Sequence, residues 1–207
     1  MVEIEKYSLS FTAASFRLHD FLRVANSFKN FAGEIDIRKV NSEEVLSKGN
    51  QKTSNREMAE FIKRYNSLTI PQRQLLIDGT LDEQKIITLL AIVKSNLFIR
   101  DFVIEVARDK FLIFDFQLTE GDFKSFLNRK SELHPELEAF ADGTIYKAKQ
   151  TIFKILADSG LIDNIRSRML IKIWLSPNAV KVISDDNPEF LKAFLFSDAD
   201  IQQELTK

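Results

Sequence analysis

The segment Ile86–Val93 constrains the fold most, because at helical spacing it is apolar on nearly all sides. A capping-box pattern, Thr80-x-x-Glu83, lies just before it and predicts where the helix begins. A helix without a polar face has to be surrounded by other elements, so we place it at the centre of the core. The apolar run is broken by Thr88 and ends at Lys94, so it is too short to span a membrane.

The rest of the chain also favours helices. Its 207 residues include only 6 glycines and 4 prolines, which argues against a turn-rich sandwich or barrel. Apolar periodicity, capping patterns and Gly or Pro boundaries predict further helices. They run from Thr12 to Phe31 with Gly33 as the stop, from the capping box Ser54-x-x-Glu57, from Thr69-Ile70-Pro71, from Leu97 to Arg108, from Thr119-x-x-Asp122, from Thr144 to Asp158 with Gly160 as the stop, and after Ser176-Pro177 and Asn187-Pro188.

Two segments have alternating patterns that suit strands, Phe111–Phe116 and Ile165–Leu175. The alternative for Phe111–Phe116 is an extended linker. We therefore predict an all-α, mainly helical fold with at most a small two-stranded β element. The helix Thr144–Asp158 followed by the alternating basic segment makes the C-terminal part winged-helix-like. We expect a helical bundle domain over residues 1–132 and a smaller C-terminal subdomain over 133–207. The alternative is one compact domain.

Positive charge is unevenly distributed. The formal net charge is only −1, but residues 46–74 carry six bases against two acids, and residues 144–182 carry seven against two. Two basic segments on a nearly neutral chain are typical of a phosphate-binding surface. The simpler interpretation is that these lysines and arginines keep surface helices solvated.

The candidate nucleic-acid-binding residues come from these two segments. The polar run Asn50–Asn55 precedes the predicted helix start at Ser54, and a helix N-terminus offers free N–H groups to a phosphate. Basic side chains on the helix and alternating segment of the second region suit phosphate contacts. The full set is Lys48, Asn50, Lys52, Arg56, Lys63, Arg64, Lys147, Lys149, Arg166 and Arg168.

Enzymatic chemistry is not indicated. The chain has no cysteine and two histidines, His19 and His134, which we interpret as a surface histidine and a residue at a helix start. No Gly-rich phosphate loop, G-x-S-x-G or H-E-x-x-H motif occurs. We therefore expect no catalytic residue, metal, cofactor or small-molecule substrate. The first residues carry two acids and no apolar run, so we expect a soluble cytoplasmic protein without membrane contact.

An ordered set of segments resembles the BrxA family of bacterial BREX phage-exclusion systems. The segments are Tyr7–Ser15, Gly49–Arg56, Phe61–Tyr65, Lys94–Val103, Glu105-Val106, His134–Leu137, Thr144–Gln150 and Ile155–Ile162. The resemblance implies a cytoplasmic helical fold likened to the antitermination factor NusB. It also implies double-stranded DNA binding beside the other BREX proteins, in a phage-defence role without catalysis.

Our leading hypothesis is a non-enzymatic BREX component that contacts duplex DNA phosphates with little base specificity. The first alternative is a protein-interaction scaffold within the BREX complex, which would expose an apolar patch and bind no DNA. The second is an RNA-binding accessory protein, suggested only by the likeness to NusB.

Overall fold

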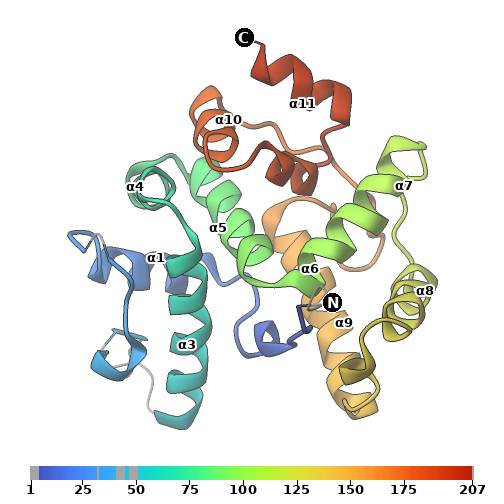
Figure 1. Cartoon of the computed structure of the whole chain (residues 1–207), viewed down its shortest axis with the longest axis horizontal. Helices are drawn as coiled ribbons and strands as arrows, with labels where there is room; N and C mark the ends of the chain where they lie inside the picture. Colours follow the sequence, from blue (N-terminus) through green and yellow to red (C-terminus); the bar gives the residue numbers. More distant parts are fainter. Residues whose placement is uncertain (1–4, 32, 41–44, 47–50, 207) are drawn as a thin grey trace.

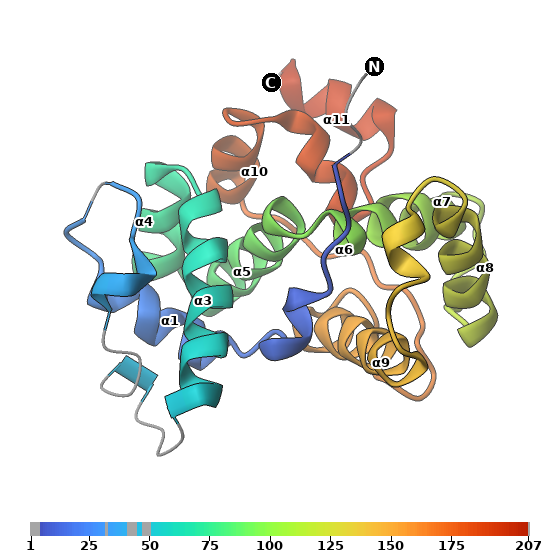
Figure 2. The same cartoon turned by 60° about the horizontal axis from the view of Figure 1, so that its bottom comes forward.

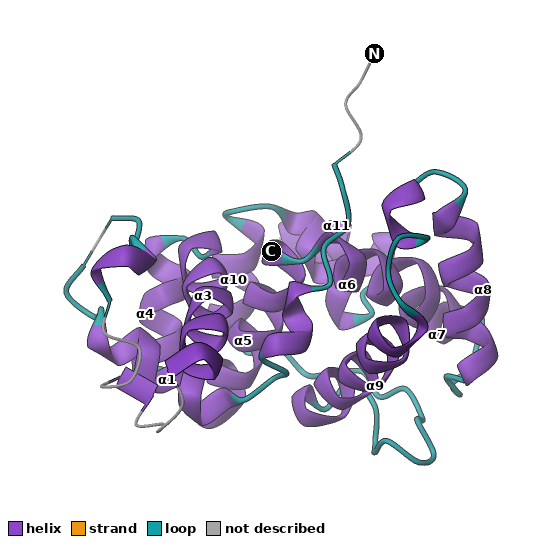
Figure 3. Ribbon diagram, turned by 90° about the horizontal axis from the view of Figure 1, so that it is seen from below, coloured by secondary structure: helices purple, strands orange, loops and turns teal. Residues whose placement is uncertain are grey.

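The protein is all-α, as the sequence predicts. The computed structural model describes residues 5–31, 33–40, 45–46 and 51–206. Figure 3 shows this part of the chain as helices joined by loops. Its β structure consists of two isolated antiparallel bridges, Gln117 with Met169 and Ile162 with Leu170.

The described chain forms α-helices, 3₁₀-helices and one π-helix. The first half contains η1 (Ser10–Ala13), α1 (Leu18–Ser27), η2 (Ile37–Lys39), α3 (Gln51–Ser67), α4 (Ile70–Asp78), α5 (Leu81–Ser95) and α6 (Leu97–Phe102). The second half contains the π-helix η3 (Val103–Arg108), α7 (Asp109–Leu112), α8 (Glu120–Ser131), η4 (Pro135–Leu137), α9 (Asp142–Ser159), α10 (Pro177–Ser184), η5 (Pro188–Phe194) and α11 (Asp198–Leu205).

Helix α5 lies at the centre of the core, which confirms the prediction from its apolar pattern. Every residue from Ile86 to Val93 is buried. Helices α1, α3, α4, α6, α9 and α10 and the 3₁₀-helix η5 all pack against α5 (Figure 1). The buried Thr88 hydroxyl donates to the carbonyl of Gln84, so the one polar side chain in this run is satisfied inside its own helix.

The predicted long helix from Thr12 to Phe31 is wrong. The chain instead forms the short η1, an extended residue at Ala14, and then α1, which starts after a left-handed Arg17 (φ 42°) and ends at Ser27 rather than at Gly33. Phe11 before the break and Phe16 within it are both buried. The break thus lies between two buried rings, where tertiary packing takes precedence over the helical periodicity of the sequence.

The two predicted strands are also wrong. Phe111 and Leu112 complete a rod formed by α6, η3 and α7, and the rod ends at a left-handed Phe114 (φ 64°). Residues 165–175 run as a loop, because the Asn164 side chain accepts the N–H groups of Arg166 and Ser167 and forms a local turn. Two isolated bridges do not make a wing, so the winged-helix expectation is not met in the described residues.

Most of the predicted caps and stops mark the ends of helices in the structure, but some do not. Reciprocal capping boxes form at Thr80 and Thr119, Ser176 and Asn187 cap α10 and η5, and Gly160 ends α9 in a left-handed conformation. Ser54 and Thr144, in contrast, lie inside helices that begin earlier, α3 at Gln51 and α9 at Asp142. A capping pattern in the sequence therefore marks a possible helix start that the fold does not always use.

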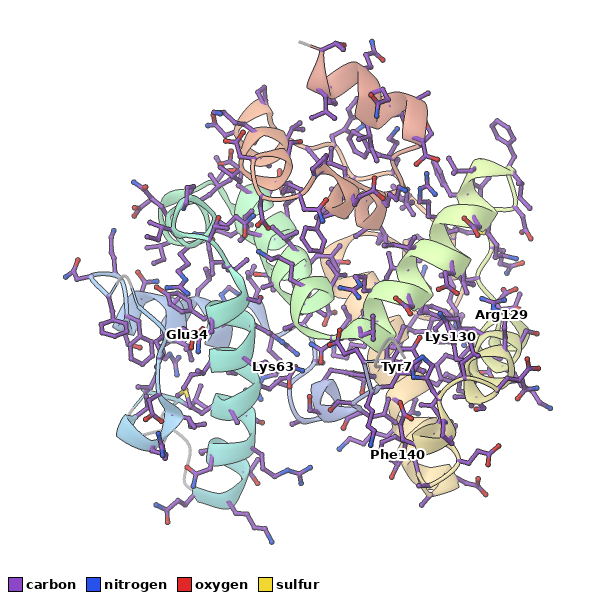
Figure 4. The ribbon with its side chains drawn as sticks, in the orientation of Figure 1. Tyr7, Glu34, Lys63, Arg129, Lys130 and Phe140 are labelled. Atoms are coloured by element: carbon purple, nitrogen blue, oxygen red, sulfur yellow. The ribbon has the colours of Figure 1, made fainter. Side chains whose placement is uncertain are left out.

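The N-terminal segment contacts the second half of the chain through hydrogen bonds and ring packing of Tyr7. The Tyr7 backbone N–H donates to Glu136 Oε1 at 2.7 Å, and its hydroxyl donates to Asp101 Oδ2 at 2.6 Å. The ring lies 3.8 Å from the ring of His134 and beside Lys130 of α8 (Figure 4). Burial is the main cause that raises the pKa of the Tyr7 phenol. One buried cluster includes residues from both sides of position 132, and the division at 132 and 133 stays a prediction.

Replacing Thr80 with Ala should lower the free energy of unfolding by about 1 kcal/mol, because the helix loses an N-cap that accepts from Glu83 N–H. Thr144→Ala is the matched control, since Thr144 lies inside α9 and is not its N-cap, and its effect should be below about 0.5 kcal/mol. Urea denaturation of the three proteins measures both changes. Equal destabilisation by the two substitutions would contradict the assigned helix starts.

Candidate nucleic-acid interface

The fold brings the two basic segments together at one hollow. Lys52 and Arg56 from α3 and Lys147 from α9 line a cavity of about 250 Å³. The remaining lining residues are Thr12 and Ala13 of η1 and Thr53 and Glu57 of α3. Residues far apart in the sequence therefore form one surface, which we call the cationic hollow.

Three elements position the side chains of the cationic hollow. Helices α3 and α9 lie on either side of η1, and both pack against it (Figures 1 and 2). Their N-terminal turns point toward the same edge of the molecule, the lower edge in Figure 1. Lys52 is in the first turn of α3, and Arg56 and Lys147 are in the second turns of their helices. The positive ends of two helix dipoles thus add to three cationic side chains.

The described residues give the three cations of the hollow no ion pair. Lys52, Arg56 and Lys147 are exposed, and none forms an ion pair within the described part of the chain. The one acid in the lining, Glu57, pairs with Arg17 instead. The lining of the hollow therefore carries three basic residues against one acid, and this excess of positive charge suits a phosphate.

Of the other candidates in the first segment, only Lys63 and Arg64 are described by the structure, and neither lines the hollow. Lys48 and Asn50 are outside the described residues. Lys63 is exposed on α3, on the side away from Glu34 in Figure 4, and its Nζ donates to Asn96 Oδ1 at 3.3 Å.

Arg64 lies in the core and not on the surface, so the prediction that it contacts phosphate is not supported by its position. Its side chain is fully buried, and the guanidinium donates to the carbonyls of Ala14 and Ser15. Its Nε lies 3.4 Å from Glu60 Oε1. Burial lowers the pKa of Arg64 to about 10, and it remains charged at neutral pH. Arg64 of α3 therefore holds the residues that follow η1 against α3 through these hydrogen bonds.

The candidates of the second segment divide into paired and unpaired cations. Lys149 Nζ donates to Glu120 Oε2 at 2.8 Å, and Arg168 Nη2 lies 3.4 Å from Glu120 Oε1. The hydrogen bond from Lys149 is the main cause that lowers the pKa of the Glu120 carboxyl. Arg166 is exposed on the loop after α9, and its side chain has no ion pair among the described residues.

A second surface is apolar. A groove of about 770 Å³ lies between α10, α11 and residues 172–175. Trp174, the one tryptophan of the chain, stands on its wall with 91% of its surface exposed. Two ion pairs lie at the rim, Lys172 with Asp200 and Lys181 with Asp185. An exposed tryptophan beside an apolar groove is unusual for a surface without a partner.

The polar residues outside these two surfaces were candidates for a metal site or a base, and the structure places them as follows. Among them, no group of three or more His, Cys, Asp or Glu is placed to hold a metal ion. His134 is buried against Tyr7, and its Nδ1 lies 3.0 Å from Glu136 Oε1, which is a structural role. No helix in the described part of the chain is long and apolar enough to cross a membrane.

Sequence reasoning missed several residues of this region. Thr12, Ala13 and Thr53 contribute to the hollow, although the sequence pattern places Thr12 at the start of a long helix. The sequence pattern does not connect Glu120 with the basic residues, because it lies 29 residues from Lys149 and 48 from Arg168. No local signal in the sequence reports such a contact.

The structure is that of a helical protein with a cationic hollow at the N-terminal turns of two helices. Within the described residues, the cations of this hollow form no ion pair. The model of the BrxA family matches residues 5–187. The chain belongs to the BrxA family.

Relatives support this assignment. A protein named BREX protein BrxA from Escherichia coli O9:H4 (strain HS) is 27% identical over 139 residues, 67% of this chain and 65% of that protein. Another of that name from Bacillus cereus (strain H3081.97) is 31% identical over 86 residues, 42% of this chain and 43% of that protein. The chain thus matches less than two thirds of the length of either relative.

A solved structure shares the fold. A crystal structure of an uncharacterized protein from Magnetospirillum magneticum superposes with a TM-score of 0.75 and 16% identity. The match covers 92% of this chain and 98% of that one. At this identity the likeness shows a common fold and nothing about activity.

Arg64→Met should destabilise the protein by on the order of 3 kcal/mol, because it leaves the buried Glu60 carboxylate without its cation and two carbonyls without a donor. Arg56→Met, on an exposed position of the same helix, should change stability by less than about 0.5 kcal/mol. Urea denaturation distinguishes the two. A small effect at Arg64 would contradict its assignment as a core arginine.

Proposed function

We propose that this protein is a cytoplasmic, non-enzymatic component of a BREX system and binds duplex DNA through its phosphates. The observation that carries the proposal is the cationic hollow, where Lys52, Arg56 and Lys147 meet without a compensating carboxylate among the described residues. The names of the relatives support membership of a BREX system. Other proteins of the system are the partners that we expect.

The chemistry of the hollow favours contacts to the DNA backbone over contacts to bases. Lysine and arginine side chains and helix N-termini bind phosphate oxygens, and such contacts position a protein without reading sequence. Arg166 and Lys63 are exposed cations outside the hollow and would extend the contact. We therefore expect binding to duplexes of any sequence, with sequence recognition and chemistry supplied by other subunits.

Neutralising the hollow should weaken DNA binding and its dependence on salt. In the variant Lys52→Gln/Arg56→Gln/Lys147→Gln, each lost phosphate contact should flatten the slope of log affinity against log salt by about 0.9. Fluorescence anisotropy with a labelled duplex of arbitrary sequence, at two salt concentrations, measures both effects. Competition with a structured RNA tests the RNA-binding alternative.

The matched control neutralises three exposed lysines outside the hollow, Lys6, Lys124 and Lys181. It removes the same charge, so the two variants separate a local site from a general effect of net charge. Equal loss in both variants would argue against the hollow as the site. No binding of the wild-type protein at low salt would contradict DNA binding.

A second candidate function is a scaffold that binds another protein of the BREX system, and the groove beside Trp174 favours it. Its lining is mainly apolar, with Leu175, Val180 and Phe196 beside the exposed indole. Tryptophans in such positions often contribute a large share of binding energy at protein interfaces. Both functions can coexist, since the groove and the hollow share no lining residue among those described.

The single tryptophan allows a direct test of the groove. Adding a partner from the system should shift its emission to shorter wavelength, because the indole leaves water. Trp174→Ala should weaken the association by on the order of 2 kcal/mol. Phe114→Ala, at another exposed aromatic residue, should leave it unchanged. Unshifted emission in a complex shown to form would place the interface elsewhere.

A further inference from the structure

Glu120 joins two of the basic side chains that the hollow does not include. Its Oε2 accepts from Lys149 Nζ at 2.8 Å, and its Oε1 lies 3.4 Å from Arg168 Nη2. The three residues come from α8, α9 and the loop after α9. One carboxylate thus lies between two cations, each facing a different oxygen. A phosphate with two free oxygens would make the same pair of contacts.

The cations are held in place, whereas the carboxylate faces water. The side chains of Lys149 and Arg168 are 17% and 21% exposed, and that of Glu120 is 61% exposed. Lys149 Nζ lies 4.9 Å from the centre of the Tyr146 ring, and the Arg168 guanidinium lies 4.4 Å from that of Phe153. Each positive group therefore has an aromatic contact in addition to its contact with Glu120.

Glu120 is also not needed to begin its helix. Thr119 and Asp122 form a reciprocal capping box at the start of α8, which satisfies the first backbone N–H groups. The carboxylate side of both ion pairs faces water, and ion pairs at the surface stabilise a fold by little. The carboxylate can therefore leave the two cations at small cost.

We propose that Lys149 and Arg168 form a second phosphate-binding site for DNA, which the Glu120 carboxylate occupies in the DNA-free protein. A backbone phosphate displaces the carboxylate, and Glu120 thereby limits affinity until DNA is bound. This inference rests on the proposed DNA-binding function and adds a regulatory residue to it.

The second site continues the cationic hollow across α9. Lys147 and Lys149 are two residues apart, so they project about 200° apart around the helix. Lys147 faces the hollow on the η1 side, and Lys149 faces α8. The exposed face of α9 between them carries Tyr146 and Gln150. A DNA backbone lying across the N-terminal half of α9 would contact both sites.

The test is a duplex titration of Glu120→Gln against the wild-type protein at several salt concentrations. Glutamine keeps the size of the side chain and removes its charge. Affinity should rise about two- to fivefold, which corresponds to the strength of an exposed ion pair. The salt slope should steepen by up to about 0.9 for each of the two cations engaged by phosphate.

Two further variants separate this mechanism from a simple change in net charge. Asp142, at the start of α9, is an exposed acid that forms no ion pair in the described structure. Asp142→Asn should therefore raise the affinity for DNA clearly less than Glu120→Gln does. In the Lys149→Gln/Arg168→Gln background, Glu120→Gln should add nothing, because the cations that it releases are gone.

The outcomes distinguish the inference from the function on which it rests. If the wild-type protein binds through the hollow and Glu120→Gln leaves affinity unchanged, the second site is wrong and DNA binding stands. The second site is equally wrong if Asp142→Asn gives an equal gain, or if the gain persists without Lys149 and Arg168. If neither protein binds duplex at low salt, both the function and the second site are contradicted.

Discussion

The fold is organised around α5, whose residues Ile86–Val93 are buried on every side. A helix with no polar face gains stability only when neighbours exclude water from its whole circumference. Helices α1, α3, α4, α6, α9 and α10 and η5 together do so. This arrangement places α3 and α9 on either side of η1, which packs against both. The cationic hollow between them is therefore a consequence of how the core closes around α5.

A charged group within the core helps to fix the edge of the hollow. Arg64 of α3 reaches the carbonyls of Ala14 and Ser15, which directly follow η1. Its hydrogen bonds compensate for part of the cost of burying a guanidinium, and Glu60 supplies the opposite charge. The same basic segment thus serves two purposes. Arg64 holds the backbone in place, and Lys52 and Arg56, nearer the start of the helix, face solvent.

The surfaces of this protein differ mainly in whether their basic residues form ion pairs, and less in how many basic residues they contain. With a net charge of −1, most lysines and arginines have an acid nearby, and many pairs link distant elements. The hollow differs because its cations lack such partners in the described structure, whereas Lys149 and Arg168 share Glu120. The apolar groove beside Trp174 has a rim of balanced ion pairs. One small helical protein therefore presents two surfaces of different chemistry.

The all-α fold, the central helix and most helix boundaries can be predicted from local sequence patterns, because these features depend on contacts within one turn. Capping at Thr80 and Thr119 joins residues three apart, and the apolar pattern of α5 is local. The segments that resemble the BrxA family also pointed to the right family. Four other features depend on tertiary contacts. They are the break near Arg17, the burial of Arg64, the position of Lys147 beside Lys52 and Arg56, and the ion pairs of Glu120. These features join residues distant in the chain, and their energies depend on burial and geometry that no local pattern encodes.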